Sequence, residues 1–124
     1  MVDAPRVPRV GAAAIVVTFP AEIDMTTADR VGEDLEAAFG PGGGVVVADL
    51  SGTRFCDSSG IRVLARAHKR AQASHSSFRV VVARPGEVVR LLEMLGLDTV
   101  LDLYPRLDVA LVAGAREPAQ VKAP

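Results

Sequence analysis

The segment GVVVADLSGTRFCDSSGIRVL, residues 44–64, joins the pattern of a strand to the pattern of a helix. Its first seven residues, Gly44–Leu50, form an apolar, β-branched run of the kind found in buried strands. Ser51 and Gly52 are turn residues, and from Ser59 to Ala73 the apolar residues recur at helical spacing. The segment therefore predicts a strand, a turn and a surface helix, which is the repeating unit of α/β domains.

The chain on either side repeats this alternation of strands and helices. Further strands are predicted at residues 13–19, 78–83 and 100–103, and the first of these is expected to be covered on both faces. Helices are predicted from a cap at Thr26 or Thr27 to Gly40, from Pro85 to Gly96, and from Pro105 onward, and residues 74–77 are expected to be a polar loop. We therefore expect an α/β domain with a mostly parallel sheet of four to five strands, about four helices and right-handed crossovers.

The length of 124 residues fits one domain. We assign the domain to residues 10–113. The two prolines in the N-terminal segment, residues 1–9, forbid a central strand there but permit a short edge strand near Val7 to Val10. Residues 114–124 form a polar, proline-bearing stretch that predicts a flexible tail.

The charge balance and composition exclude several classes of function. Fourteen basic and fifteen acidic residues give a net charge of −1, and no dense basic cluster is present, so nucleic acid is not an expected partner. No apolar run approaches the roughly 20 residues of a membrane span, and the start MVDAPRVPRV lacks a signal-peptide core. The single Cys56 cannot form an internal disulfide, and no Cys/His cluster has zinc-ligand spacing. We expect a cytoplasmic protein with no cofactor, no metal and no membrane partner.

The serine pair in Asp57-Ser58-Ser59-Gly60 invites comparison with a hydrolase nucleophile. A nucleophile elbow requires G-x-S-x-G, and Cys56 stands where the first glycine would be. The two histidines, His68 and His75, precede the later acids, which reverses the hydrolase order. These departures disfavour an enzyme.

Other reactive-looking features also have simple structural interpretations. Residues 40–44 (GPGGG) run from a helix into a strand and lack the Lys-Ser/Thr of a phosphate-binding loop, which indicates a connector. Cys56 lies between Phe55 and Asp57 and is interpreted as a small packed residue rather than a redox sensor. His68 and His75 are interpreted as structural or solvated.

The helix start at the serine pair leaves two interpretations open. Asp57 or Ser58 can cap the helix, and capping alone accounts for these residue types. A helix N-terminus also tolerates a phosphate, which would add roughly −1.5 to −2 charges to any docking surface there. The four residues alone do not decide between a cap and a regulatory site.

Three separated motifs together resemble the STAS domain of bacterial anti-sigma-factor antagonists. These motifs are Glu22-Ile23-Asp24 followed by Thr26-Thr27-Ala28, then Asp57-Ser58-Ser59-Gly60 after its strand, and Leu92-Glu93-Met94-Leu95-Gly96-Leu97. The resemblance covers residues 10–112. One departure is Ala21, which replaces the glycine of the family's G-E-[LI]-D phrase.

The resemblance implies a phosphoprotein that controls transcription by partner switching, for example in a stress response. Ser59 corresponds to the family's phosphorylated serine, and the residues expected to contact the partner are Asp24, Asp57, Ser58, Ser59, Gly60 and Arg62. The implied partners are an anti-sigma factor, which is a serine kinase of the histidine-kinase-like ATPase fold, and a phosphoserine phosphatase. The alternative is a non-switching STAS scaffold or accessory subunit, for example of a lipid-transport ATPase.

Overall fold

The computed structural model describes residues 14–41 and 43–115. The short edge strand expected near the N-terminus lies outside these ranges. The predicted tail, residues 114–124, overlaps the last helix by two residues, because that helix ends at Ala115, and the rest of the tail also lies outside the described ranges.

The main sheet has four parallel strands in the order β1-β3-β5-β6, which confirms the predicted fold class. Its strands are β1 (Ala14–Thr18), β3 (Gly44–Leu50), β5 (Ser76–Val82) and β6 (Asp102–Tyr104). Two short strands, β2 (Glu22–Ile23) and β4 (Phe55–Cys56), pair in parallel as a separate ladder. The helices are α1 (Met25–Ala38), α2 (Ser58–Ser74), α3 (Glu87–Met94) and α4 (Leu107–Ala115), with a 3-10 turn, η1, at Leu97–Thr99.

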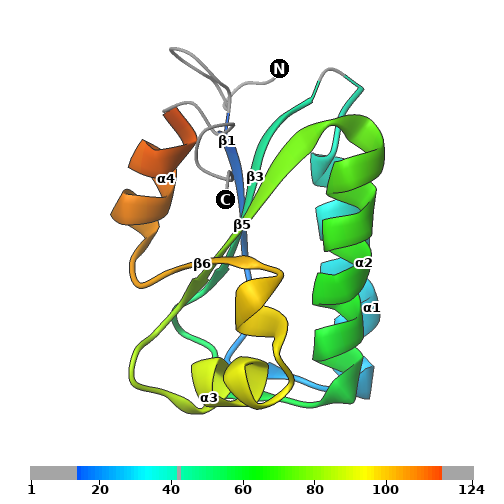
Figure 1. The fold of residues 1–124 in the computed structure, drawn as a ribbon. Helices are drawn as coiled ribbons and strands as arrows, with labels where there is room; N and C mark the ends of the chain where they lie inside the picture. The colour runs from blue at the N-terminus through cyan, green and yellow to red at the C-terminus, as the bar shows by residue number, and fades with distance from the viewer. Residues whose placement is uncertain (1–13, 42, 116–124) are drawn as a thin grey trace.

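The helices cover the two faces of the sheet unequally. Figure 1 shows α1 and α2 side by side along one face and α4 on the other. The larger core lies on the α1 and α2 face, where Val46, Ala48, Val80 and Val82 of the central strands are buried. The opposite face is covered by α4 through Ala110, which packs in a smaller cluster with valines of β3 and β5. Successive residues of β3 and β5 alternate between the two cores, because neighbouring side chains of a strand point to opposite faces of the sheet.

Strand β1 corrects the expectation of a strand covered on both faces. Within the described residues it pairs only with β3, so it lies at the edge of the main sheet. Its side chains are half-buried or exposed, and Val16 is 37% exposed. An apolar, β-branched run alone does not distinguish a central strand from an edge strand.

Several predicted boundaries also differ from the structure. Residues 74–77 are not a polar loop, because α2 continues to Ser74 and β5 begins at Ser76, leaving only His75 between them. His75 makes this tight connection in the left-handed conformation, with a φ of 56°. Pro85 precedes α3 instead of lying in its first turn, and Gly86 is the N-cap.

The spacing of Val88, Leu91, Leu92 and Leu95 predicts one apolar stripe along α3, and the structure buries only part of it. The buried residues are Val88, Val89 and Leu92, whereas Leu95 is 54% exposed. Leu95 is the C-cap residue, just beyond the last residue of α3. Gly96 has a φ of 76°, which agrees with the predicted glycine at the helix end.

Candidate functional site

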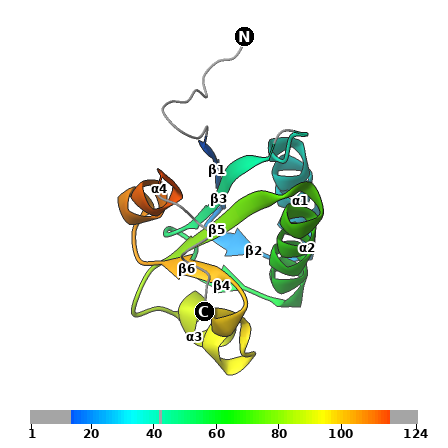
Figure 2. The same ribbon diagram turned by 45° about the horizontal axis from the view of Figure 1, so that its top comes forward.

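The two short strands hold the starts of α1 and α2 next to each other. Ile23 pairs with Cys56, and the Asp57 amide donates a hydrogen bond to the Ile23 carbonyl at 3.1 Å. Each strand leads directly into a helix, and in both cases the connecting residue is an aspartate, Asp24 or Asp57. Figure 2 shows β2 beside β4 and α1 beside α2. Two family motifs, distant in sequence, therefore meet at the carboxyl ends of the strands.

Asp24 caps α1, which corrects the prediction of Thr26 or Thr27. Its Oδ1 atom accepts hydrogen bonds from the Thr26 amide at 2.9 Å and from the Thr26 hydroxyl at 2.6 Å. Thr27 completes a capping box, because its hydroxyl oxygen accepts a hydrogen bond from the Asp24 amide at 3.0 Å. These bonds stabilise the carboxylate, so the pKa of Asp24 is below its ordinary value, chiefly through the Thr26 hydroxyl.

Asp57 caps α2 and determines how the two serines are presented. Its Oδ1 atom accepts a hydrogen bond from the Ser59 amide at 2.8 Å, so Asp57 is the cap among the two predicted candidates. Ser58 is exposed and Ser59 is half-buried in the first helical turn. The predicted helix cap is therefore present, and it leaves the side chains of both serines at the surface.

Gly60 lies where no side chain fits. A Cβ atom added there would be 2.5 Å from Cys56 Sγ and 2.7 Å from Ile23 Cγ2. Both neighbours are buried, and both belong to the short strands. Gly60 thus lets the first turn of α2 pack directly on the β2–β4 pair.

Cys56 is a packed residue, as the sequence indicated. It is buried beneath Gly60, and burial raises the pKa of its thiol to about 11, with a further contribution from the Asp57 carboxylate. A thiol with such a pKa carries almost no thiolate at neutral pH, and the thiolate is the reactive form. A redox or nucleophilic role for Cys56 is disfavoured.

Ser59 opens onto a depression of about 410 Å³ between α1 and α2. Residues of both helices line it: Met25, Ala28 and Asp29 from α1, and Ser59, Arg62, Val63 and Arg66 from α2. Of these seven residues, only Ser59 and Arg62 were predicted from the sequence as partner contacts; the other five were not. Arg66 follows Ser59 by seven residues, so the helical repeat could have revealed it. The α1 residues could not be found without the β2–β4 pairing.

Two large apolar side chains are exposed around the helix starts. Met25, the first residue of α1, is 71% exposed, and Phe55 of β4 is 51% exposed. We call Met25, Phe55, Ser58, Ser59 and Arg62 the serine face. The structure thus places apolar, hydroxyl and cationic side chains around the adjacent starts of α1 and α2.

Ala21, the departure from the family phrase, lies just before β2. Its carbonyl accepts hydrogen bonds from the amides of Arg54 at 2.7 Å and Phe55 at 3.3 Å. The side chain is exposed, so the methyl group that replaces the glycine hydrogen points away from the core. The substitution leaves the backbone contacts to β4 intact.

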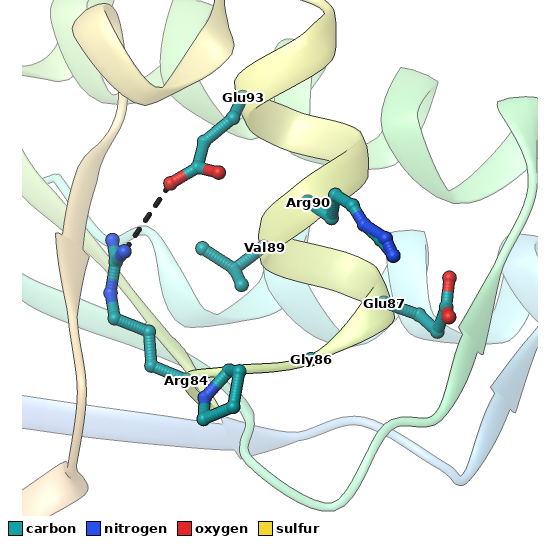
Figure 3. Close-up of a pocket in the computed structure, with 7 residues that line it drawn as sticks. Arg84, Gly86, Glu87, Val89, Arg90 and Glu93 are labelled. Atoms are coloured by element: carbon teal, nitrogen blue, oxygen red, sulfur yellow. Dashed lines mark hydrogen bonds and ion pairs between the residues drawn. The ribbon is translucent and has the colours of Figure 1, made fainter.

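A larger depression, of about 740 Å³, lies at the turn from β5 into α3 and shares no residue with the serine site. Figure 3 shows an ion pair between Arg84 and Glu93 on one side of α3 and the side chains of Glu87 and Arg90 on the other side. The Arg84 Nη1 and Glu93 Oε2 atoms are 3.3 Å apart. Two carboxylates accompany the two guanidinium groups, so this depression has no excess charge. None of its lining residues belongs to the serine motif, and its balanced charges do not favour binding an anion or a cation.

Within residues 14–41 and 43–115, no cluster of three or more His, Cys, Asp or Glu side chains could hold a metal ion. Across the same ranges, no helix has both the length and the apolar character that crossing a membrane requires.

Comparisons with known proteins agree with the motifs. A crystallised anti-sigma factor antagonist from Mycobacterium paratuberculosis is 33% identical, with 83% of this chain and 86% of that chain covered and a TM-score of 0.74. An anti-sigma-factor antagonist (STAS) domain protein from Planctomyces limnophilus is 30% identical, covering 81% of this chain and 88% of that chain, with a TM-score of 0.70.

A structure with lower sequence identity supports the assignment of the fold alone. The anti-sigma factor antagonist SpoIIAA, solved in its unphosphorylated form, has 13% identity and a TM-score of 0.58 over 94% of this chain and 96% of that chain. A comparison with curated proteins finds no match. The family model described as the STAS domain matches residues 1–110, which is most of the sequence. The chain therefore belongs to the STAS domain family.

Proposed function

We propose that this chain is an anti-sigma-factor antagonist that binds its anti-sigma factor when Ser59 is unmodified and is released when Ser59 is phosphorylated. Family membership and the two neighbours above that are at least 30% identical support the first part. The observation that carries the second part is the position of Ser59. It lies at the surface in the first turn of α2, bounded by the Asp57 cap and the side-chain-free Gly60.

The composition of the serine face supports a docking role. Exposed methionine and phenylalanine side chains supply apolar area that a partner can bury, and aromatic residues, methionine and arginine are enriched at the centres of interfaces. Arg62 adds a cation beside the two hydroxyl groups. A partner seated on this face would cover Ser59, so a group added to Ser59 would lie inside the interface.

The switching step is a phosphoryl transfer to Ser59. The Ser59 Oγ atom attacks the γ-phosphorus of ATP, its proton is lost, and the bond to the β-phosphate oxygen breaks to release ADP. The product carries a dianion where a hydroxyl group had been. Burying that dianion against a surface without paired donors costs a few kcal/mol, and about 2.7 kcal/mol is already a hundredfold loss of affinity.

This function makes the chain a substrate and a binding partner, with no catalytic residue of its own. The transfer would be catalysed by an anti-sigma factor that is a serine kinase of the histidine-kinase-like ATPase fold. A phosphoserine phosphatase would restore the binding form, and the cycle would run in the cytoplasm. Asp24, which connects β2 to α1, contributes by fixing the start of α1, which carries Met25.

Binding titrations against candidate anti-sigma factors test the proposal. Ser59→Ala is expected to bind as tightly as the parent chain, and Ser59→Asp at least about tenfold more weakly. Gln72→Glu is a matched control, because it adds one negative charge at an exposed position near the far end of the same helix. Equal binding of Ser59→Asp and the parent, or capture of a transport ATPase in place of an anti-sigma factor, would favour a non-switching STAS subunit.

A further inference from the structure

Two arginines share the depression onto which Ser59 opens. Arg62 and Arg66 follow Ser59 by three and seven residues on α2, and all three residues line the same depression of about 410 Å³. Residues three or four apart on a helix are neighbours, with Cβ atoms about 5–6 Å apart. Arg62 is therefore a direct neighbour of Ser59, and Arg66 lies one turn further along the same side.

Helix geometry points both arginines toward the serine. The Cα–Cβ bonds of an α-helix tilt toward its N-terminus, and long side chains lean the same way. At about 1.5 Å rise per residue, Arg62 and Arg66 lie about 4.5 Å and 10.5 Å beyond Ser59 along the axis. An extended arginine side chain spans much of either separation, so a phosphate on Ser59 would lie within reach of Arg62 first.

Neither arginine is engaged elsewhere in the described part of the chain. The ion pairs found there join Arg30 to Asp34, Arg70 to Glu36, Arg84 to Glu93, and Arg106 to Asp108. Asp29, on the α1 wall, lines the same depression as Ser59, and Asp57 caps the helix by accepting a hydrogen bond from the Ser59 amide. A dianion on Ser59 would therefore meet two carboxylates and two guanidinium groups, and the guanidinium groups are free to turn toward it.

We propose that Arg62, assisted by Arg66, binds the phosphate of phosphorylated Ser59 within the same chain. The proposal rests on the proposed function only in taking Ser59 as the modified residue. Guanidinium groups bind phosphate oxygens through paired, charge-assisted hydrogen bonds, which makes arginine suited to this contact. The phosphate would then fill the depression between α1 and α2 and withdraw Arg62 from the serine face. Release of the partner would follow from a lost cation and an occupied depression as well as from added negative charge.

The test uses full-length protein that carries phosphoserine at position 59, introduced by genetic encoding so that no kinase is needed. Phosphorus-31 NMR titration measures the second pKa of the phosphate in the parent, Arg62→Gln, Arg66→Gln and Lys69→Gln proteins. Bound cations favour the dianion and lower that pKa, which lies near 6 in an unperturbed phosphoserine. Arg62→Gln is expected to raise it by about half a pH unit or more, and Arg66→Gln by less.

Lys69→Gln is the matched control, because it removes one positive charge from an exposed position of the same helix, ten residues from Ser59. It is expected to leave the phosphate pKa nearly unchanged. Equal titration of the Arg62→Gln and Lys69→Gln proteins would overturn the proposal. This outcome is independent of any kinase, so it differs from a failure of the proposed function, in which no anti-sigma factor phosphorylates Ser59.

Discussion

Replacing Gly60 by alanine tests the packing that positions the serine site. The new Cβ atom would be 2.5 Å from Cys56 Sγ and 2.7 Å from Ile23 Cγ2, and the Ile23 Cβ atom is a further 0.5 Å away at 3.2 Å. Contacts below 3.0 Å require atoms to move. Ile23 and Cys56 are buried and belong to the paired strands β2 and β4. The start of α2 or this strand pair must therefore shift to accommodate the new methyl group.

Two opposing effects set the size of the change in stability. Forcing an extra methyl group into a well-packed site costs about 1–3 kcal/mol. Alanine recovers at most about 1 kcal/mol over glycine through its helix propensity. The two contacts to buried atoms place this site at the upper end of the overpacking range, so we expect a net loss of about 1–2 kcal/mol. With a urea slope of about 1–3 kcal/mol per molar, the unfolding midpoint would fall by roughly 0.3–2 M.

Gly32→Ala is the matched control. Gly32 lies in the interior of α1, and a Cβ atom there would have its nearest neighbour, Val63 Cγ2, at 3.8 Å, an ordinary contact. This variant is expected to gain about 0.5–1 kcal/mol from helix propensity alone. Urea unfolding of both variants, followed by circular dichroism, measures the difference. If Gly60→Ala were as stable as Gly32→Ala, the first turn of α2 would not pack on the short strands as described.

Two further substitutions test the helix caps, and one reactivity measurement tests the buried thiol. Asp57→Ala removes the acceptor of the Ser59 amide and is expected to lower the free energy of unfolding by about 1 kcal/mol, measured by urea unfolding. Because the pKa of Asp24 is lowered below 3.8, its carboxylate stabilises the fold above that pH and loses this effect as the pH falls through the folded-state pKa. Asp24→Asn is therefore expected to reduce the acid sensitivity of the unfolding midpoint. The native Cys56 thiol, with its pKa raised from 9.0 to about 11, is expected to react with a thiol reagent at pH 8 about 100-fold more slowly than the unfolded chain.

The main sheet was predictable where local residue types decide the structure. The run Gly44–Leu50 forms a strand with the predicted bounds because its β-branched residues are buried in a central position. Strands β2 and β4 were missed, since two residues carry no periodicity. They exist because Glu22 pairs with Phe55, a contact across 33 positions that no local pattern encodes.

The site was also predictable only where local residue types decide the structure. Asp57 was among the two predicted caps of α2, because few residue types can cap a helix and the motif offers them side by side. At α1, however, Asp24, Thr26 and Thr27 are all acceptable caps, and the choice falls on Asp24 because β2 fixes its extended backbone. Met25 lies in the same depression as Ser59 only because the two helix starts are adjacent, so no local sequence pattern indicates this contact.

The proposed switch requires that Ser59 accepts the phosphate that controls partner binding. The most direct measurement is the intact mass of the protein after incubation with its anti-sigma factor and ATP, followed by peptide mapping. We expect one added phosphate, located on Ser59, with none added to Ser59→Ala and full modification of Ser58→Ala. A phosphate on any other residue, or continued modification of Ser59→Ala, would contradict it.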